Sequence, residues 1–302
     1  MKIGFIGLGK MGSNMTKRLI DDGHEVVAYD PNEDARAVAE STGVQAVESR
    51  EFLVGSQEQQ IVWLMIPSKF VDEELDELLK IVSNEAIIID GGNSDFRLSK
   101  QRAVRAAKHG VQFVDVGTSG GILGLEHGYS MMVGGDSKSV KTLSPILTSL
   151  SPPNGWHHFG ESGSGHYVKM VHNAIEYGLM ESYAEGYRLL NEGPYKELNL
   201  AAAGRVWQQG SIIQSLLNGL TAEALSENPK LDGIDGFVHE SGEARWALEL
   251  AKELKVETPS ISAAFDVRLR SQKGEVNFAT KLLAAMRNKF GGHAINKDNN
   301  EK

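Results

Sequence analysis

The chain has 302 residues, of which 41% are hydrophobic and 24% are charged, and its formal net charge is −9. These values are typical of a globular protein with about two domains. Because the sequence contains no cysteine, disulfides, thiolate metal sites and cysteine nucleophiles are excluded. The acidic balance argues against a nucleic-acid partner held by bulk charge, and no apolar run is long enough to predict a membrane span.

The N-terminus runs from Met1 directly into a strand-like pattern, without signal-peptide features. We therefore expect a cytoplasmic protein. Up to about residue 160, strand-like runs occur at Lys2–Ile6, Glu25–Tyr29, Gln60–Ile66, Ala86–Asp90, Val111–Val116 and Ser130–Val133. Helical patterns lie between them at Met11–Asp22, Val71–Val82 and Ser94–His109. This alternation predicts an α/β, Rossmann-like domain with a mostly parallel sheet over residues 1–162.

The pattern changes after Gly163, where no further strand is predicted. Periodic helical stretches occur at Tyr167–Leu190, Leu198–Leu217, Glu243–Lys255, Ser260–Ser271 and Asn277–Phe290. Residues 163–302 are therefore predicted to form an all-helical C-terminal domain for substrate binding and dimerisation.

A glycine-rich motif follows the first predicted strand. Gly7-Leu8-Gly9-Lys10-Met11-Gly12 matches the GxGxxG pattern of dinucleotide-binding turns, with a strand before it and a helix after it. Asp30 lies 18 residues beyond Gly12, at the end of the second strand, where a carboxylate can accept hydrogen bonds from ribose hydroxyls. It would also repel a 2′-phosphate. The nearest following cation is Arg36, predicted to lie a turn or more into the next helix, so NAD is favoured over NADP.

A polar stripe marks the first helix of the second domain. Lys169, His172, Asn173, Glu176 and Tyr177 have the i, i+3, i+4, i+7 and i+8 spacing of one helical face. The other face is apolar enough to be buried, which favours a functional stripe over a solvated one. Lys169 and Glu176 would be about 10 Å apart along the helix axis, so they suit a base and an acid acting on different carbons of one small polyol.

Further candidate site residues follow two predicted strands and end the chain. The turns at 90–94 and 115–121 contain Asn93, Ser119, Gly120 and Gly121, which can bind a carboxylate or hydroxyls at the carboxyl edge of the sheet. Arg287 and His293 flank a glycine pair after the last helix, and Arg268 lies upstream. These cationic residues are candidates for binding an anion, and Arg245 is a weaker one. Metal ligands are not predicted.

These motifs together resemble the 6-phosphogluconate dehydrogenases and, more broadly, the β-hydroxyacid dehydrogenases. FIGLGKMGSNM is similar to the cofactor signature of the broad superfamily, in which Leu8, Lys10 and Met11 accompany the three glycines. KMVHNAIEYG, at 169–178, is more specific to the decarboxylating enzymes, and GGNS, TSGG and RNKFGGH support the same resemblance. The similarity runs from Lys2 to His293, and the length is that of the short bacterial form.

The resemblance implies oxidative decarboxylation of 6-phospho-D-gluconate to D-ribulose 5-phosphate and CO2 with reduction of NAD, in the pentose phosphate route or in gluconate breakdown. Lys169 would be the base at the C3 hydroxyl, and Glu176 would protonate C1 of the enediol. The other implied substrate contacts are Asn93, Ser119, Gly120, Gly121, His172, Asn173, Tyr177, Arg268, Arg287 and His293, with Asn93 also at the cofactor. In the family, the closing Arg and His reach into the neighbouring subunit's site, which implies a homodimer or higher homo-oligomer.

One segment departs from the family pattern. Long-form enzymes bind phosphate with a Lys-Gly-Thr-Gly-Lys-Trp-Thr-like segment, whereas this chain has Ser241-Gly-Glu-Ala-Arg-Trp-Ala247.

Two alternative functions stay open. One is a dehydrogenase for a small unphosphorylated acid such as 3-hydroxyisobutyrate, which would need neither Glu176 as an acid nor cations for a phosphate. The other is a non-catalytic nucleotide-sensing or scaffolding dimer, which would need no base and acid.

Overall fold

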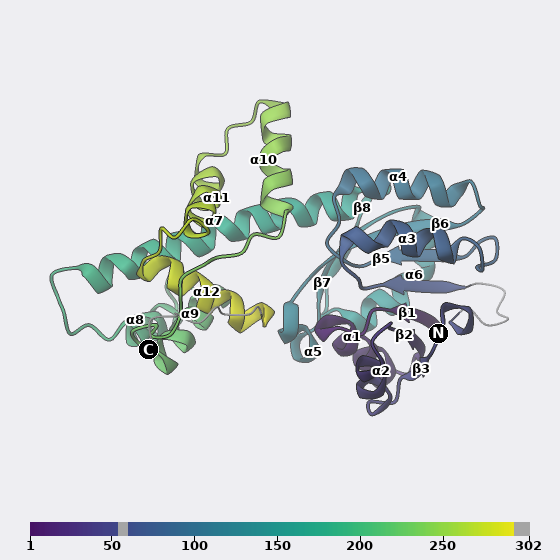
Figure 1. The fold of residues 1–302 in the computed structure, drawn as a ribbon, viewed down its shortest axis with the longest axis horizontal. Helices are drawn as coiled ribbons and strands as arrows, with labels where there is room; N and C mark the ends of the chain where they lie inside the picture. Colours follow the sequence, from purple (N-terminus) through teal and green to yellow (C-terminus); the bar gives the residue numbers. More distant parts are fainter. Residues whose placement is uncertain (54–59, 293–302) are drawn as a thin grey trace. The chain divides into compact units, whose positions relative to one another are not determined.

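The computed structural model describes residues 1–53 and 60–292, and the chain divides into two compact units, Met1–Met170 and Val171–Lys302 (Figure 1). The first unit is built on one eight-stranded sheet in the order β3-β2-β1-β4-β5-β6-β7-β8. The strands are β1 (Lys2–Ile6), β2 (Glu25–Tyr29), β3 (Gln45–Val47), β4 (Ile61–Leu64), β5 (Ile87–Asp90), β6 (Gln112–Ser119), β7 (Ser130–Gly134) and β8 (Trp156–Gly160).

Strands β1 to β6 are parallel, and their order 3-2-1-4-5-6 is that of a doubly wound dinucleotide-binding sheet. β7 pairs antiparallel with β6 and parallel with β8. The predicted mostly parallel sheet is confirmed, and all six strand-like runs are strands. Two strands were not predicted: β3, which has three residues, and β8, in which two histidines obscure the apolar alternation.

Helices cover both faces of this sheet because alternate strand residues are apolar on both sides. Ile3 and Phe5 of β1 belong to the core under α1 (Lys10–Asp21), α2 (Glu33–Glu40) and α6 (Ser137–Leu150). Ile6 faces the opposite core, under α3 (Ser68–Leu78) and α4 (Phe96–Ala107). The carboxyl ends of the parallel strands are therefore the edge at which loops can form a site.

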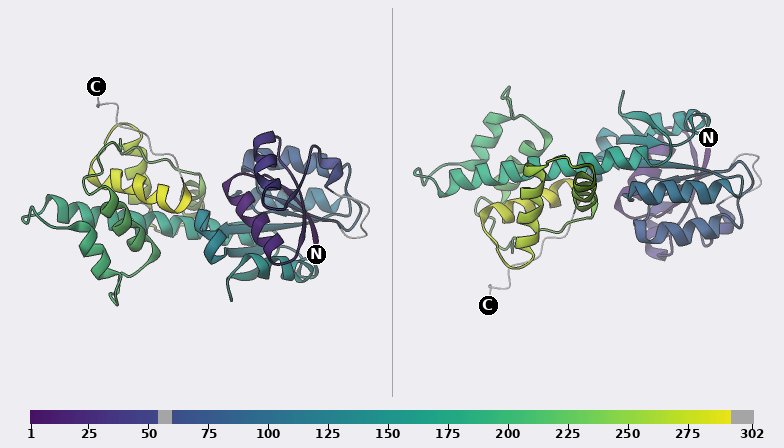
Figure 2. Two further views of the ribbon diagram at one scale, coloured as in Figure 1. Left: turned by 90° about the horizontal axis from the view of Figure 1, so that it is seen from below. Right: turned by 90° about the horizontal axis from the view of Figure 1, so that it is seen from above.

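In the second unit, all the described regular elements are helices (Figure 2). They are the end of α7 (Ser164–Glu192), then α8 (Leu200–Trp207), α9 (Leu216–Glu227), α10 (Glu243–Leu254), α11 (Pro259–Ser271) and α12 (Phe278–Gly291). One core joins α7 to α8, α9 and α12, and a smaller one joins it to α10 and α11. The prediction of a single helix over Leu198–Leu217 is wrong, since the chain leaves the helix after α8 and Gly210 adopts a φ of +76°.

Candidate active site

The glycine-rich motif forms the tight turn between β1 and α1. Gly7 has a φ of +99°, and a Cβ on it would lie 2.4 Å from the carbonyl oxygen of Met65. A Cβ on Gly12 would lie 1.9 Å from the oxygen of Gly7, so the helix can pack on the turn only with glycine there. A Cβ on Gly9, by contrast, would have no atom within 4 Å. The open space lies at the start of α1, whose first turn carries no acidic residue, and therefore fits a pyrophosphate.

The other residues of the glycine-rich motif contribute backbone N–H groups, and Asp30 lies next to the motif. Lys10 and Met11 open α1, so their N–H groups belong to its first turn. Leu8 has a buried side chain, and its N–H donates to Oδ2 of Asp30 at 2.7 Å. The second carboxylate oxygen of Asp30 accepts from the N–H of Asn32 at 2.8 Å. Asp30 thus holds the end of β2 against the glycine-rich turn, where a ribose would lie.

Arg36 lies nearer to this position than its place in the helix suggests. It is the fourth residue of α2, but its side chain points back, and Nη1 donates to the carbonyl oxygen of Asp30 at 2.8 Å. A cation therefore lies beside the expected ribose position after all. The carboxylate of Asp30 remains the group that would meet a 2′-phosphate.

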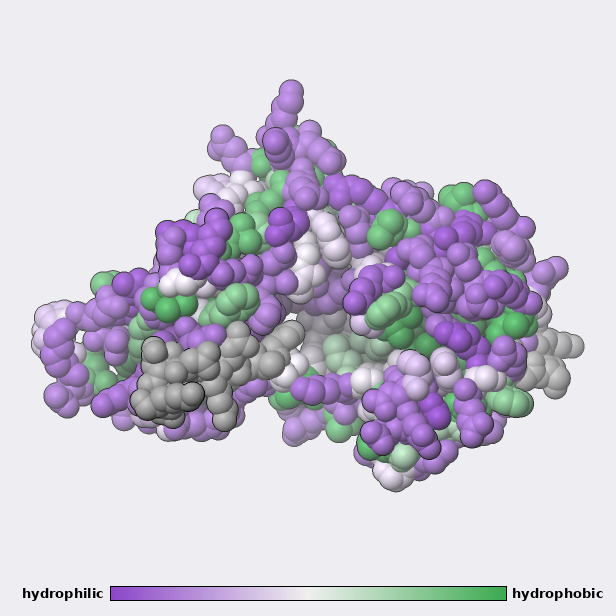
Figure 3. Space-filling view, in the orientation of Figure 1, coloured by the Kyte–Doolittle hydropathy of each residue, from purple (hydrophilic) through white to green (hydrophobic). Residues whose placement is uncertain are grey.

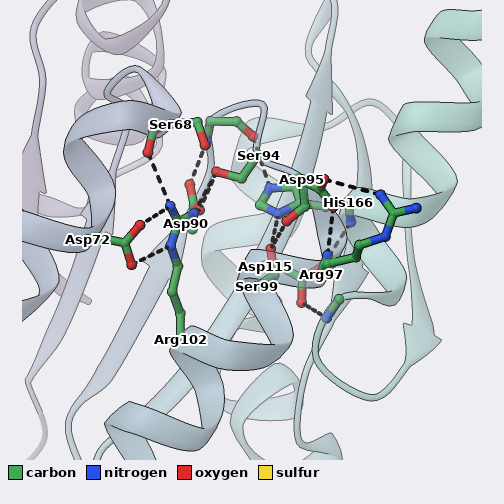
Figure 4. A network of polar contacts seen from close by, with 12 residues as sticks. Ser68, Asp72, Asp90, Ser94, Asp95, Arg97, Ser99, Arg102, Asp115 and His166 are labelled. Carbon is green, nitrogen blue, oxygen red and sulfur yellow. Dashed lines mark hydrogen bonds and ion pairs between the residues drawn. The ribbon is translucent and has the colours of Figure 1, made fainter. Parts of the chain in front are cut away.

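Two buried carboxylates stand side by side at the carboxyl ends of β5 and β6, where Asp90 pairs in register with Asp115. Asp90 accepts hydrogen bonds from the N–H of Gly92, from Ser94 Oγ at 2.8 Å and from Arg102 Nη1 at 3.1 Å (Figure 4). Arg102 is itself buried and also bonds Asp72, and these hydrogen bonds lower the pKa of Asp72. This network folds the loop after β5 inward and leaves Asn93 exposed.

Asp115 fixes the start of α7. Its two oxygens accept from the N–H groups of Gly163, at 2.6 Å, and His166, at 2.8 Å. A carboxylate is stabilised at a helix N-terminus, where unpaired N–H groups gather. The buried His166 ring bridges Ser99 Oγ, 2.7 Å from Nδ1, and the carbonyl oxygen of Gly92, 3.0 Å from Nε2 (Figure 4). The first turn of α7 is thus tied to β6, α4 and the loop that carries Asn93.

Lys169 follows on the next turn of α7, and its side chain is 5% exposed. A Cβ on Gly117 of β6 would lie 2.3 Å from Cβ of Lys169, so the helix and the strand approach too closely for any other residue. Ser119 ends β6, and Gly120 turns the chain with a φ of +133°. The loop beyond is fastened to α1 by hydrogen bonds from Asn14 to Ile122 and from Arg18 to Leu125.

The rest of the stripe on α7 belongs to the second unit, where Tyr177 lies under Arg268 of α11. The guanidinium carbon is 3.2 Å from the ring centroid. Among the described residues, the hydrogen-bond partners of Arg268 are the carbonyl oxygen of His239, at 3.4 Å, and Sδ of Met180, at 3.6 Å. Burial lowers the pKa of this arginine to about 10. A buried cation with such weak partners fits an anionic ligand.

Arg287 is the second cation of this cluster. It is buried in α12, and burial lowers its pKa, opposed by the charges of Tyr177, Glu176 and Glu243. The resemblance implies that this arginine reaches the site of a neighbouring subunit, and within its own chain it lies near Tyr177, Glu176 and Glu243. The two arginines also act on each other electrostatically. His293 lies outside the described residues.

The segment 241–247 contains a buried acidic residue to which the sequence patterns assigned no role. Glu243 opens α10 and is buried, and Oε1 accepts from Asn173 Nδ2 at 3.0 Å. The hydroxyl of Tyr177 accepts from the N–H of Ser241 at 3.3 Å. Arg245, the weaker candidate for binding an anion, is paired with Glu240 at 2.7 Å and exposed. The sequence signal for this residue was a glutamate at position 243, where the long-form segment has a threonine.

Two findings concern metals and membranes. Within residues 1–53 and 60–292, no group of three or more His, Asp or Glu side chains is placed to bind a metal ion. No helix in the same ranges is long and apolar enough to span a bilayer.

The doubly wound sheet and the glycine-rich turn, with Asp30 beside it, define a protein of the dinucleotide-binding Rossmann class. Comparison with known families specifies it further. Residues 2–159 match the NAD binding domain of 6-phosphogluconate dehydrogenase, and residues 165–302 match the C-terminal domain of that enzyme. The chain belongs to the 6-phosphogluconate dehydrogenase family.

Similar proteins cover the chain along its whole length. YqeC of Bacillus subtilis, whose name as a 6-phosphogluconate dehydrogenase is itself provisional, is 40% identical, covering 98% of this chain and 100% of its own. The NAD(+)-dependent, decarboxylating 6-phosphogluconate dehydrogenase of Haloferax volcanii is 38% identical, covering 98% of both. The Plasmodium falciparum 6-phosphogluconate dehydrogenase, solved apo, with NADP+ and with 6-phosphogluconate, has a TM-score of 0.83 at 28% identity, covering 100% of this chain and 67% of its own.

Proposed function

We propose that the protein oxidises and decarboxylates 6-phospho-D-gluconate to D-ribulose 5-phosphate and CO2, with NAD as the preferred cofactor. The observation that carries this proposal is the buried Arg268, stacked on Tyr177 and accompanied by Arg287. Two buried guanidinium groups suit a phosphate, which can accept several hydrogen bonds and offset their loss of hydration. A dehydrogenase for a small unphosphorylated acid would have no use for them.

The chemistry at the other end of the substrate would fall to α7. Lys169 takes the proton of the C3 hydroxyl while the C3 hydride leaves, and the bound NAD supplies the hydride acceptor. The resulting 3-keto acid loses CO2 because its carbonyl takes up the electron pair of the breaking bond, and return of the proton from Lys169 to that oxygen gives an enediol. Glu176 donates a proton to C1 of this enediol, and the loss of the enol proton forms the ketone. The helical spacing of Lys169 and Glu176, about 10 Å, suits action on different carbons.

Cofactor and substrate contacts are proposed on the same basis. Gly7, Gly9, Gly12 and the first turn of α1 would hold the pyrophosphate, and Asp30 would hold the ribose. Asn93, Ser119, Gly120 and Gly121 would bind the carboxylate and hydroxyls together with His172 and Asn173. The NAD preference is supported by the Asp30 carboxylate and by the NAD-dependent Haloferax relative. We propose that the boundary between the two domains lies at residue 163, because this residue directly precedes α7.

We also propose a homodimer or larger homo-oligomer. Val171, Ile175 and Leu179 lie four residues apart on α7 and are exposed. Most of the surface visible in Figure 3 is hydrophilic, with hydrophobic residues scattered across it. An aligned apolar row on one helix is therefore a candidate contact for a second copy.

The deciding experiment supplies 6-phosphogluconate with NAD or with NADP and measures reduced cofactor and CO2 together. We expect both products in equal amounts, faster with NAD. Reduced cofactor without CO2 would indicate a simple β-hydroxyacid dehydrogenase. No reduced cofactor with either dinucleotide would refute the proposed function.

A further inference from the structure

We propose that Glu243 is a positioning residue that fixes the amide of Asn173 and, through it, the proton on the imidazole of His172. The three side chains form a chain of hydrogen bonds within the second unit. Asn173 Nδ2 is 3.0 Å from Glu243 Oε1, and Asn173 Oδ1 is 2.9 Å from His172 Nδ1. Glu243 is 2% exposed and Asn173 is 8% exposed, so water competes little for these contacts.

The chemistry of the groups sets the direction of this chain. A carboxylate oxygen only accepts hydrogen bonds, so the NH2 side of the Asn173 amide must face Glu243. The carbonyl side then faces His172, and a carbonyl oxygen also only accepts. Nδ1 of His172 must therefore carry a proton, and a neutral ring in this tautomer presents the lone pair of Nε2 at its other edge.

Glu176 reinforces this arrangement. Its Oε2 lies 4.0 Å from the same Nδ1, beyond hydrogen-bond distance, and the ionised carboxylate favours a proton on Nδ1 electrostatically. Glu176 is the proposed acid. The row of side-chain contacts therefore runs from Glu243 through Asn173 and His172 to a residue that would take part in the reaction. If the proposed function holds, Nε2 of His172 is the atom that would accept a hydrogen bond from a hydroxyl of the substrate.

Glu243 is suited to this role in a way that a threonine would not be. A threonine hydroxyl can donate or accept, so it would not dictate which side of the Asn173 amide faces it. Oε2 of Glu243 is buried without a hydrogen-bond partner among the described residues, and Arg287 lies within electrostatic reach. The arginine balances the charge of the carboxylate, and Oε1 remains committed to Asn173.

The tautomer of His172 can be observed directly by 15N NMR of the imidazole rings in the full-length protein at neutral pH. His172→Gln identifies the signals. We expect Nδ1–H in the wild type. In Glu243→Gln the glutamine carbonyl can still accept from Asn173, so Nδ1–H should stay the major form, although its NH2 group makes the bias weaker than a carboxylate does. In Glu243→Met, which keeps the volume but removes the acceptor oxygen, we expect the Nε2–H form to become populated. Glu249→Gln, an exposed change on α10, should leave the spectrum unchanged.

An unchanged Nδ1–H signal in Glu243→Met would overturn the inference, and Glu243→Ala gives the same test if the methionine variant fails to fold. A loss of Nδ1–H in Glu243→Gln as large as in Glu243→Met would also overturn it, since the charge and not the acceptor would then be responsible. In kinetics, we expect kcat with 6-phosphogluconate to fall about ten- to a hundredfold in Glu243→Met, with KM changing less, and to recover in Glu243→Gln. Absence of turnover in the wild type would refute the proposed function, whereas the NMR result would stand or fall by itself.

Discussion

The guanidinium of Arg268 stacks on the ring of Tyr177, with its central carbon 3.2 Å from the ring centroid. The cation is held over an aromatic face, with Nη1 directed at the carbonyl oxygen of His239 and Nη2 at Sδ of Met180. The stack therefore sets the orientation as well as the position of the cation.

Arg268→Lys keeps the charge but loses the planar fork, so the contact with a phosphate should weaken. We expect KM for 6-phosphogluconate to rise about tenfold or more, since a hydrogen bond to a charged group contributes about 1.5–3 kcal/mol. Initial rates over a range of substrate concentrations measure this. Arg270→Lys, an exposed neighbour on the same helix, is the control and should match the wild type. Equal KM values for all three proteins would contradict a phosphate contact at Arg268.

Glu176→Gln removes the proposed acid with little change in volume. Because general acid catalysis typically contributes 10²–10⁴-fold, kcat should fall by about that factor while 6-phosphogluconate still binds. Calorimetric titration measures the binding of 6-phosphogluconate, and the formation of reduced cofactor and CO2 measures kcat. Glu185→Gln, an exposed change further along α7, should keep full activity. Wild-type turnover in Glu176→Gln would refute the acid assignment.

Glu181 should make the stability of the protein depend on pH. It is buried on α7, and burial raises its pKa from 4.5 to about 7, aided by Glu185 and opposed by Arg268. The folded state therefore binds this proton more tightly than the unfolded chain, so stability is lost as the pH rises from about 4.5 to about 7. The total loss is about 3 kcal/mol.

Glu181→Gln removes this dependence. The difference in Tm between Glu181→Gln and the wild type should move in favour of the variant by several degrees between pH 4 and pH 8, and should be constant above that. Thermal unfolding at a series of pH values measures it. A difference that does not change with pH would show that Glu181 titrates normally in the folded protein.

Asp30→Asn tests the basis of cofactor preference. The amide keeps an acceptor for the N–H of Leu8 but removes the charge that would repel a 2′-phosphate, and Arg36 lies beside it. We expect kcat/KM to fall about tenfold with NAD and to rise with NADP. Asp34→Asn, the same substitution at an exposed position of α2, is the control. A wild type that prefers NADP would make the interpretation of Asp30 wrong.

Ile175→Glu tests the apolar row on α7. A charge in the middle of an apolar contact is costly to bury, so the variant should sediment as a smaller species than the wild type at the same concentration. Leu189→Glu, another exposed apolar residue of the same helix but outside the row, provides the comparison. An unchanged assembly in Ile175→Glu would place the contact elsewhere.

The local patterns predicted the sheet and the helix that carries the polar stripe, because strand alternation and helical spacing depend on residues near in sequence. The expectation that the apolar face of this helix is buried is wrong in part, since Val171 and Ile175 are exposed and Lys169 is buried. They did not predict β8, whose apolar signal is broken by histidines, or the break between α8 and α9. They also assigned no role to His166 or Glu243. Both act through partners 67 and 70 residues away, and a single sequence contains no sign of such pairings.

The sequence by itself determined which chemistry this chain carries: a dinucleotide turn, a polar stripe with Lys169 and Glu176, and cations near its end. These features follow from residue type and spacing along one element. Only the tertiary structure decided which charges are buried together, such as Arg268 over Tyr177 and Glu243 against Asn173. The reason is physical, since burial and hydrogen bonding are properties of groups brought together by packing and are not fixed until distant segments meet.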